Sequence, residues 1–301
     1  MQRLLKRWLA PVLPHWLRQR IKAHAAAGLN DGPVKEITLE ETETFIRCTI
    51  DHSWSFLAPK ECQYDLELHQ STQEGRAELS GIATVALQGG VMFDIGAHMG
   101  IMSAIFCAAK PTNKVYSFEP SPITQKRLEV IRDLNQIQDR MFIQPTAIGQ
   151  DRAKLEMTID PLGGYVQIQK FEHAGWGETK QIQVDVESIP QAAERLGVIP
   201  DFIKIDIESY EYEALLGAKT FLIEHQPVLL FELHSNYLEQ RGLKPGQVID
   251  LLLECGYDFT TYTGQPLTAR FVADSPLSNL RFLATPKNGA ASRTAEAVLQ
   301  V

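Results

Sequence analysis

The chain of 301 residues holds 44% hydrophobic and 22% charged side chains, the proportions of a soluble globular protein with a sizeable core. Its net charge of −8 argues against nucleic acid as a partner, and no run of about 18 apolar residues predicts a transmembrane helix. The four cysteines are scattered without a C-x-x-C pair, which argues against a zinc site or a disulfide framework and favours a cytoplasmic location.

Residues 1–28 differ from the rest of the chain because they carry six basic side chains and no acidic ones. Leu4, Leu5 and Trp8 give this segment an apolar side. We expect residues 1–30 to form a basic helical appendage that packs on the main domain or on a second copy in a homo-oligomer. Peripheral contact with an anionic membrane through residues 1–28 is one alternative, and disorder is the other. The segment lacks the apolar core and cleavage site of a signal peptide.

Residues 31–90 are expected to form an extension in front of the main domain. Strand-forming patches at 45–50 and 54–57 predict a hairpin. Residues 62–87 predict a helix that ends before Gly89 and Gly90.

From residue 91 the chain alternates between predicted strands and helices, which implies a parallel sheet covered on both faces. This domain is assigned to residues 91–286, with an irregular insertion at 153–184 and a flexible tail at 287–301. Strands are predicted at 91–96, 114–119, 140–148, 201–207, 227–233 and 257–263, with a final antiparallel strand at 279–285. Helices are predicted at 100–109, 122–135, 187–196, 211–224 and 246–255.

A glycine-rich turn follows the first of these strands. Asp94 lies near the strand end, and Gly96 and Gly100 lead into an apolar helix, which is the geometry that binds nucleotide-like cofactors at a helix N-terminus. The spacing is D-x-G-x-x-x-G, with His98 where a dinucleotide loop has its middle glycine. A side chain there blocks the close approach of a pyrophosphate. The turn therefore favours a cofactor without phosphates, such as S-adenosylmethionine.

A second carboxylate supports this interpretation. Glu119 ends the next predicted strand, 25 residues after Asp94 and near the spacing of about 20 residues expected for a group that binds ribose hydroxyls. Ser121 and Pro122 then provide an N-cap and a first helical position.

Charged residues also gather near the strand predicted at 201–207. Lys204, Asp206 and Glu208 lie two residues apart, and in an extended strand they would share one face. Such charges in a central strand need each other, water or a ligand. Glu232 and His234 end the following apolar strand at the same expected edge of the sheet.

Methyl transfer to a hydroxyl group needs alignment of the reactants and a base that removes the proton. Glu208 and His234 are the candidate bases, and Asp206 and Glu232 are candidates to orient substrate hydroxyls. Two carboxylates and a histidine would suit Mg²⁺ or Mn²⁺ only loosely, so no metal ligand is assigned.

Several motifs in series resemble the FkbM family of methyltransferases. They occur in the family's order and approximate spacing over residues 90–235, and they are Asp94–Gly100, Phe118–Pro122, Asn135, Ala147–Gly149, Lys204–Glu208, Glu211 and Pro227–Glu232. The resemblance implies an α/β, Rossmann-like class I methyltransferase fold, with a seven-stranded, mostly parallel sheet, helices on both faces and a reversed last strand. It also implies O-methylation of a hydroxyl group on a small-molecule or glycan acceptor, such as a sugar or related natural product, by S-adenosyl-L-methionine.

The resemblance also implies roles for individual residues. Asp94, Gly96 and Gly100 would form the cofactor loop, and His98, which departs from the family, could still donate a hydrogen bond to the methionine carboxylate of the cofactor. The ribose would be held by Glu119, and the adenine would be flanked by Ala147. The reaction centre and its substrate contacts would include Lys204, Asp206, Glu208 and Glu211, and the residue pattern described above adds His234 and Glu232.

The sequence departs from the family pattern at His98, at Ser209 and at Val184–Glu187, where the family usually has Leu-Asp after the insertion. The family commonly has asparagine in place of His98 and glycine in place of Ser209. The second departure affects the turn after the fourth strand and hence the choice of substrate. Three alternatives stay open: an N-methyltransferase, a nicotinamide-dependent oxidoreductase or epimerase, and a non-catalytic binding module with the same fold.

Overall fold

The computed structural model describes residues 36–51, 54–160, 164–169, 178–262, 264–275 and 279–287. The expected basic appendage at 1–30 lies outside these residues, and so does the expected tail apart from Lys287. No described helix is both long enough and apolar enough to cross a membrane.

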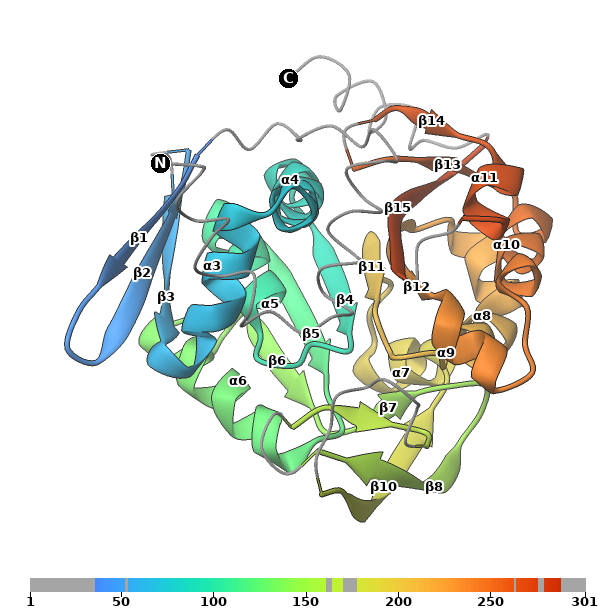
Figure 1. Cartoon of the computed structure of the whole chain (residues 1–301), viewed down its shortest axis with the longest axis horizontal. Coiled ribbons are helices and arrows are strands. Elements are labelled where there is room, and N and C mark those ends of the chain that lie inside the picture. The colour runs from blue at the N-terminus through green and yellow to red at the C-terminus, as the bar shows by residue number, and fades with distance from the viewer. Residues whose placement is uncertain are drawn as a thin grey trace, which may run out of the picture.

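The central sheet has the strand order β14-β13-β15-β12-β11-β4-β5-β6 (Figure 1). The strands are β4 (Val91–Ile95), β5 (Lys114–Phe118), β6 (Met141–Gln144), β11 (Phe202–Ile205), β12 (Val228–His234), β13 (Tyr257–Thr260), β14 (Pro266–Leu267) and β15 (Asn279–Pro286). The five strands from β6 to β12 run parallel, and β15 lies antiparallel to both β12 and β13. This confirms the expected fold class and its reversed last strand. The two-residue strand β14 is an addition to the seven expected strands.

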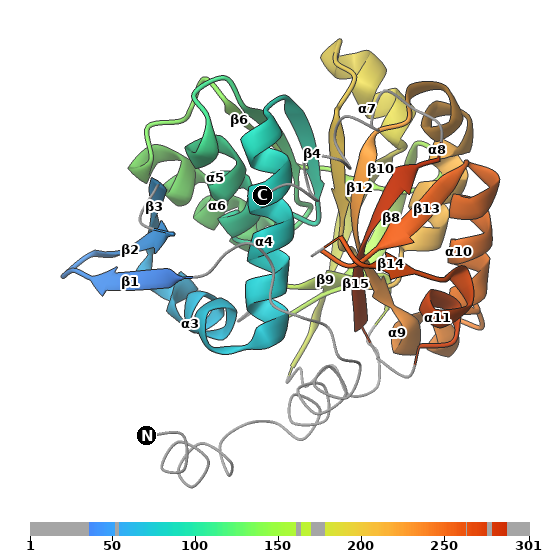
Figure 2. The ribbon, with the colours of Figure 1, turned by 90° about the horizontal axis from the view of Figure 1, so that it is seen from above.

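Alternating side chains of the strands divide the core into two layers. Met92 and Phe202 pack with α4 (Gln73–Gln88), α5 (Ile101–Ala109) and α6 (Pro122–Leu134). Their neighbours Phe93 and Ile203 face the opposite way, because successive side chains of a strand point to opposite faces. These pack with α7 (Ile189–Leu196), α8 (Glu211–His225) and α10 (Pro245–Glu254), on the other side of the sheet in Figure 2.

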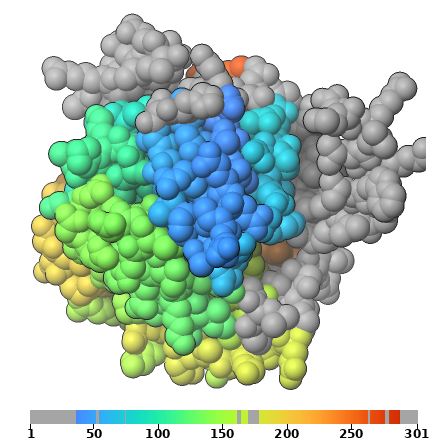
Figure 3. Space-filling model, turned by 90° about the vertical axis from the view of Figure 1, so that its left-hand side faces the viewer, coloured from blue at the N-terminus to red at the C-terminus, as the bar shows by residue number. Residues whose placement is uncertain are grey.

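The N-terminal extension is larger than the predicted hairpin and helix. Three antiparallel strands precede η1 (Lys60–Cys62), α3 (Gln63–Ser71) and α4, and they are β1 (Ile37–Glu41), β2 (Phe45–Ile50) and β3 (Trp54–Pro59). Strand β3 packs against α5 and α6, so the small sheet covers one side of the molecule (Figure 3).

The side chain of Asn135 fastens this extension to the main domain. Its Oδ1 accepts a hydrogen bond from the Leu57 N–H, and its Nδ2 donates to the Leu57 carbonyl, both at 2.7 Å. Nδ2 also donates to the Ile131 carbonyl at 2.6 Å. One amide at the end of α6 therefore satisfies the backbone edge of β3, which has no neighbouring strand on that side among the described residues.

The strand predicted at 140–148 is divided in the structure. Strand β6 ends at Gln144, because Pro145 cannot donate a backbone hydrogen bond. The chain then enters β7 (Ala147–Ile148) in a second sheet of order β7-β10-β8-β9, completed by β8 (Ala153–Ile159), β9 (Val166–Gln167) and β10 (Lys180–Glu187). The insertion was predicted at 153–184. In the structure the chain leaves the central sheet earlier, at the end of β6, which lies at the carboxyl edge of the parallel strands. The short helices α9 (Ser235–Gln240) and α11 (Ala269–Ala273) complete the described elements.

Replacing Asn135 by alanine should lower the free energy of unfolding by about 1–3 kcal/mol, because both backbone groups of Leu57 lose their partner. Gln138→Ala is the matched control, since this amide is exposed and bonds only to Asp133. It should change the free energy by about 0.5 kcal/mol at most. Urea denaturation measures both values. Equal effects of the two substitutions would show that Asn135 does not hold the extension.

Candidate functional site

A cavity of about 360 Å³ opens at the carboxyl ends of β4, β5, β11 and β12, and this volume is in the usual range for a small-molecule site. Ten expected site residues line it: Gly96, His98, Gly100, Glu119, Ala147, Lys204, Asp206, Glu208, Glu232 and His234. The other two, Asp94 and Glu211, are fully buried and lie behind the wall. Residues far apart in the sequence therefore meet at one edge of the sheet, as ligand sites in such folds do.

The loop after β4 lies against the end of β11. Gly96 has a φ of 80°, and a Cβ atom on it would lie 1.9 Å from the backbone oxygen of Asp206. Gly100, which caps α5 with a φ of 87°, would place a Cβ atom 2.5 Å from Leu128. Both glycines are therefore required by their surroundings, whichever ligand binds.

Glu119 fixes the position of this loop. Its Oε2 accepts the His98 N–H and its Oε1 accepts the Ser121 N–H, both at 2.8 Å. Burial raises the pKa of Glu119 to about 7, although these two hydrogen bonds oppose the increase. One carboxyl group thus joins the turn after β4 to the start of α6.

His98 has a left-handed backbone with a φ of 48°, a conformation that asparagine and histidine adopt more readily than most residues. Its ring stacks on Tyr165 with 4.3 Å between the ring centroids. Tyr165 lies just before β9 and also lines the cavity. The insertion thus contributes an aromatic wall that the irregular pattern at 153–184 did not predict.

The prediction that Lys204, Asp206 and Glu208 share a strand face was wrong. Strand β11 ends at Ile205, and the chain turns immediately afterwards. Glu208 and Ser209 have φ values of 53° and 85°, in the left-handed region that favours glycine. The turn nevertheless leaves all three charged side chains in the cavity wall.

Lys204 is a buried cation between two carboxylates. Its Nζ lies 2.9 Å from Asp206 Oδ2 and 3.9 Å from Asp94 Oδ1, and the residue is only 8% exposed. Burial opposes its charge, but Asp206 and Asp94 outweigh burial and raise the pKa of Lys204. Asp94 also accepts a hydrogen bond from Ser103 at 2.6 Å. Asp94 therefore stabilises the end of β4 through these buried contacts and does not line the cavity.

His234 is the centre of a second group of charges. Its Nδ1 lies 2.6 Å from Glu211 Oε1, and its Nε2 lies 3.6, 3.7 and 3.8 Å from carboxylate oxygens of Asp206, Glu232 and Glu208. Burial alone would lower the pKa of His234, but Glu208 and Glu211 outweigh it and raise the pKa to about 10. Glu211 thus orients the imidazole from behind and does not reach the cavity.

The opposite wall contains residues that the sequence analysis did not identify. Arg281 Nη2 lies 2.6 Å from Glu232 Oε2, and its Nε lies 3.3 Å from Glu78. Asn279 donates to Glu232 Oε1 at 2.8 Å, and His69 lies 3.2 Å from Glu78. Arg281 is the single charged residue of the final strand β15, and this was the sequence feature that could have marked this wall.

Comparison with known proteins identifies a family. The sequence profile described as "Methyltransferase FkbM domain" matches residues 94–259, which is more than half of the chain. Protein arginine N-methyltransferase 6 of Danio rerio is 38% identical over 58 residues, which are 19% of this chain and 16% of that protein.

Two solved structures resemble the chain at low identity. Methyltransferase FkbM from Methylobacillus flagellatus has a TM-score of 0.40 at 19% identity, over 65% of this chain and 43% of that one. An O-methyltransferase family protein from Burkholderia thailandensis has a TM-score of 0.39 at 10% identity, over 70% and 56% of the two chains. At such low TM-scores neither likeness bears on function. The chain covers less than half of the FkbM structure and of the arginine methyltransferase.

The raised pKa of Glu119 predicts a pH dependence of stability. The folded protein binds this proton up to about pH 7, whereas the unfolded chain releases it near 4.5. The free energy of unfolding should therefore lose about 3 kcal/mol from this group as pH rises from 4.5 to above 7. The groups around the carboxyl are the N–H groups of His98 and Ser121, Thr124 and the Asp94 carboxylate.

Glu119→Gln should lack this loss, because the amide does not titrate. Urea denaturation of both proteins between pH 4.5 and 8 measures the difference in slope. Parallel pH profiles of the two proteins would contradict the raised pKa.

Proposed function

This chain belongs to the FkbM family of methyltransferases, and from this premise we propose that it methylates a hydroxyl group of a sugar, glycan or related natural product. Membership in this methyltransferase family supports S-adenosylmethionine as the methyl donor. The observation that carries the finer proposal is that one cavity joins the glycine loop and Glu119 to the carboxylates and imidazole at the ends of β11 and β12.

The residues at one end of the cavity fit S-adenosylmethionine. Gly96 leaves room where the loop meets Asp206, and His98 occupies the position that a pyrophosphate would need. Glu119, whose oxygens each accept one backbone N–H, lines the cavity, where its carboxyl group is the candidate partner of a ribose hydroxyl. Ala147 gives a small apolar wall for the adenine. When bound, this cofactor supplies a methyl group already activated on a positively charged sulfur.

The acceptor is proposed to lie at the other end of the cavity, beside Glu232 and the wall formed by residues of α3, α4 and β15. Glu78, His69, Asn279 and Arg281 offer several hydrogen-bonding groups in one buried surface. Such a wall suits a ligand with many hydroxyl groups better than an apolar one. The chain's contribution to the reaction is to hold the acceptor hydroxyl in line with the methyl group.

Glu208 is the proposed general base. His234 is the weaker candidate, because the surrounding carboxylates raise the pKa of its imidazole to about 10 and so make it a poor proton acceptor. Glu208 lies in the cavity wall, with Oε2 held by Gln167 at 2.9 Å and Oε1 3.8 Å from His234. The acceptor oxygen forms its bond to the methyl carbon as the carbon–sulfur bond breaks, with the electron pair left on sulfur and the hydroxyl proton passed to Glu208.

The proposal is tested with methyl-labelled S-adenosylmethionine and an array of free sugars, glycans and hydroxylated natural products. Label should appear in an acceptor as a methyl ether, which resists alkali, whereas a methyl ester releases its label in alkali. Label only in esters or in amines would refute hydroxyl methylation. An array without a labelled compound, together with intact cofactor binding, would favour a binding module.

Asp94→Ala should weaken the binding of S-adenosylmethionine at least tenfold, because Asp94 positions Ser103 and Lys204 below the glycine loop. Asp258→Ala is the control, since Asp258 is an exposed carboxylate on β13 of the same sheet. Equilibrium dialysis measures affinity, and thermal unfolding checks that the variants fold. Asp94→Asn keeps the shape if the alanine variant is unstable. Unchanged affinity in both Asp94 variants would refute the site assignment.

Glu208→Gln should leave cofactor affinity nearly intact and lower turnover by about 10²-fold or more, because the hydroxyl proton loses its acceptor. The exposed Glu254 supplies the control variant Glu254→Gln. Turnover is measured with the acceptor found in the array. Full activity of Glu208→Gln would move the role of base to His234.

A further inference from the structure

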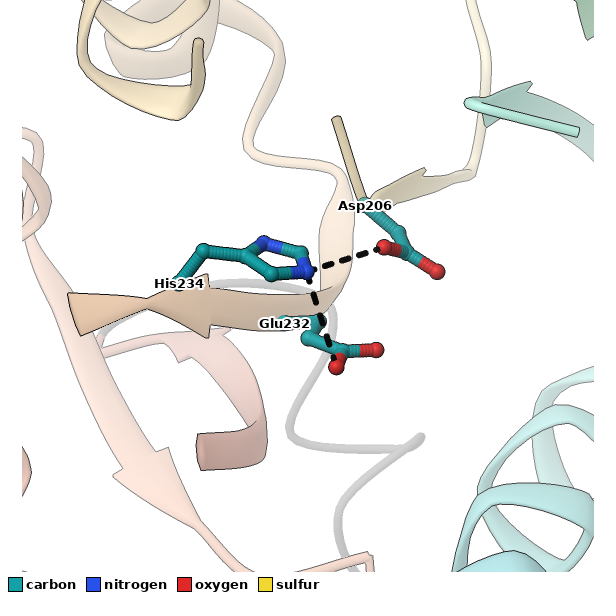
Figure 4. Close-up of side chains that lie close together, drawn as sticks. All are labelled: Asp206, Glu232 and His234. Atoms are coloured by element: carbon teal, nitrogen blue, oxygen red, sulfur yellow. Dashed lines mark ion pairs between the residues drawn. The ribbon is translucent and has the colours of Figure 1, made fainter. Parts of the chain in front are cut away.

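Three side chains from two neighbouring strand ends meet at one point of the cavity. Asp206 follows β11, and Glu232 and His234 lie at the end of β12. One oxygen or nitrogen of each lies within 4.8 Å of the others. Figure 4 shows the imidazole Nε2 pointing toward the carboxylates of Asp206 and Glu232. Glu232 and His234 are only 4% and 2% exposed, so this group is not a solvated surface cluster.

The far side of the imidazole is already fixed. Glu211 lies behind His234, with Oε1 2.6 Å from Nδ1, and it is completely buried. Its other oxygen, Oε2, has no hydrogen-bond partner among the described residues. Histidines that bind metals usually donate their second nitrogen to a carboxylate in this manner, which orients the ring and makes the ligating nitrogen more basic.

Nε2 itself makes no hydrogen bond to any described residue. Its nearest oxygens, on Asp206, Glu232 and Glu208, lie 3.6 to 3.8 Å away, beyond the 2.7–3.2 Å typical of an N–H donor. Nε2 belongs to a residue of the cavity wall and lies among three carboxylate oxygens, whose negative charges favour a positive charge beside it. In the ion-free protein a proton on Nε2 supplies that charge, and a divalent cation bound to Nε2 would displace the proton and supply the charge in its place.

These distances fit a shared cation. Two ligand atoms bound to one ion at about 2.1 Å lie roughly 3–4 Å apart, depending on the angle at the metal. Nε2 lies 3.6 Å from Asp206 Oδ1 and 3.7 Å from Glu232 Oε1. Glu232 Oε1 accepts a hydrogen bond from Asn279, and Lys204 pairs with Oδ2 of Asp206, the other oxygen from the one nearest to Nε2.

We propose that Asp206, Glu232 and His234 bind one divalent cation, with Mn²⁺ as its best-fitting representative. Carboxylates suit Mg²⁺ and Mn²⁺, and an imidazole ligand favours the transition metal of the two. Three protein ligands leave coordination positions that open on the cavity. An acceptor hydroxyl at such a position would lose its proton to Glu208 more readily, and this role of the cation rests on the proposed function.

The test uses the full chain and Mn²⁺ alone, without cofactor or acceptor. Electron paramagnetic resonance titration should find one bound Mn²⁺ per chain, and the spin-echo spectrum should contain a ¹⁴N coupling from an imidazole. Asp206→Asn and His234→Gln should each lose stoichiometric binding, and Glu254→Gln should bind as the unaltered protein does. Glu211→Gln should keep the ¹⁴N coupling but bind 10–100-fold more weakly, as expected for a residue that positions a ligand.

Absence of stoichiometric Mn²⁺ binding by the unaltered chain would overturn the proposal. Binding without ¹⁴N coupling, or binding retained in both Asp206→Asn and His234→Gln, would overturn it too, because the ion would then lie elsewhere. Thermal unfolding shows whether each variant folds. If the chain labels an acceptor but binds no Mn²⁺, only the cation site is refuted. If it binds Mn²⁺ but labels no acceptor, only the proposed function is refuted.

Discussion

The buried ammonium group of Lys204 is the interaction on which the site depends. It lies between Asp94 at the end of β4 and Asp206 after β11, where the two strands are paired in register. Moving a lysine and two carboxylates out of water costs several kcal/mol for each ion, and the cost is offset only when the charges are paired closely. The pairing therefore fixes the distance between the two strand ends.

This constraint positions both halves of the cavity. On one side the backbone of Asp206 touches Gly96, so the glycine loop follows the end of β11. Glu119, which follows β5, accepts hydrogen bonds from the backbone of the glycine loop and from the start of α6, and it therefore holds these segments together. On the other side the Asp206 carboxylate faces His234, which Glu211 orients from behind. The cofactor end and the proposed acceptor end are thus linked through one aspartate, Asp206, whose side chain is partly buried.

Much of this arrangement could be predicted from local sequence patterns. Apolar runs followed by glycine or by an N-cap indicate strand–turn–helix units, and the end of each parallel strand lies at the same edge of the sheet. Gly96, Glu119 and Glu232 could therefore be assigned to one site. The direction of a side chain was not predictable in the same way. Asp94 and Glu211 lie behind the wall because their partners, Ser103 and His234, are set by tertiary packing.

The remaining differences come from contacts between distant segments. Glu208 turns the chain by adopting a left-handed backbone conformation. Glutamate rarely adopts this conformation, so the sequence did not predict the turn. Arg281 reaches the site because β15 pairs with β12, and Glu78 reaches it because α4 packs beside α5. Neither pairing leaves a pattern within one sequence window. The wall proposed for the acceptor therefore comes from the ends of the described chain, largely outside residues 94–259.

Calorimetric titration of the full chain with S-adenosylmethionine, its demethylated product and NAD tests the central claim most directly. The geometry of Gly96, His98 and Glu119 predicts micromolar binding of both sulfur compounds and none of NAD. Binding of NAD, or of neither sulfur compound, would contradict the assignment of this cavity to a methyl donor.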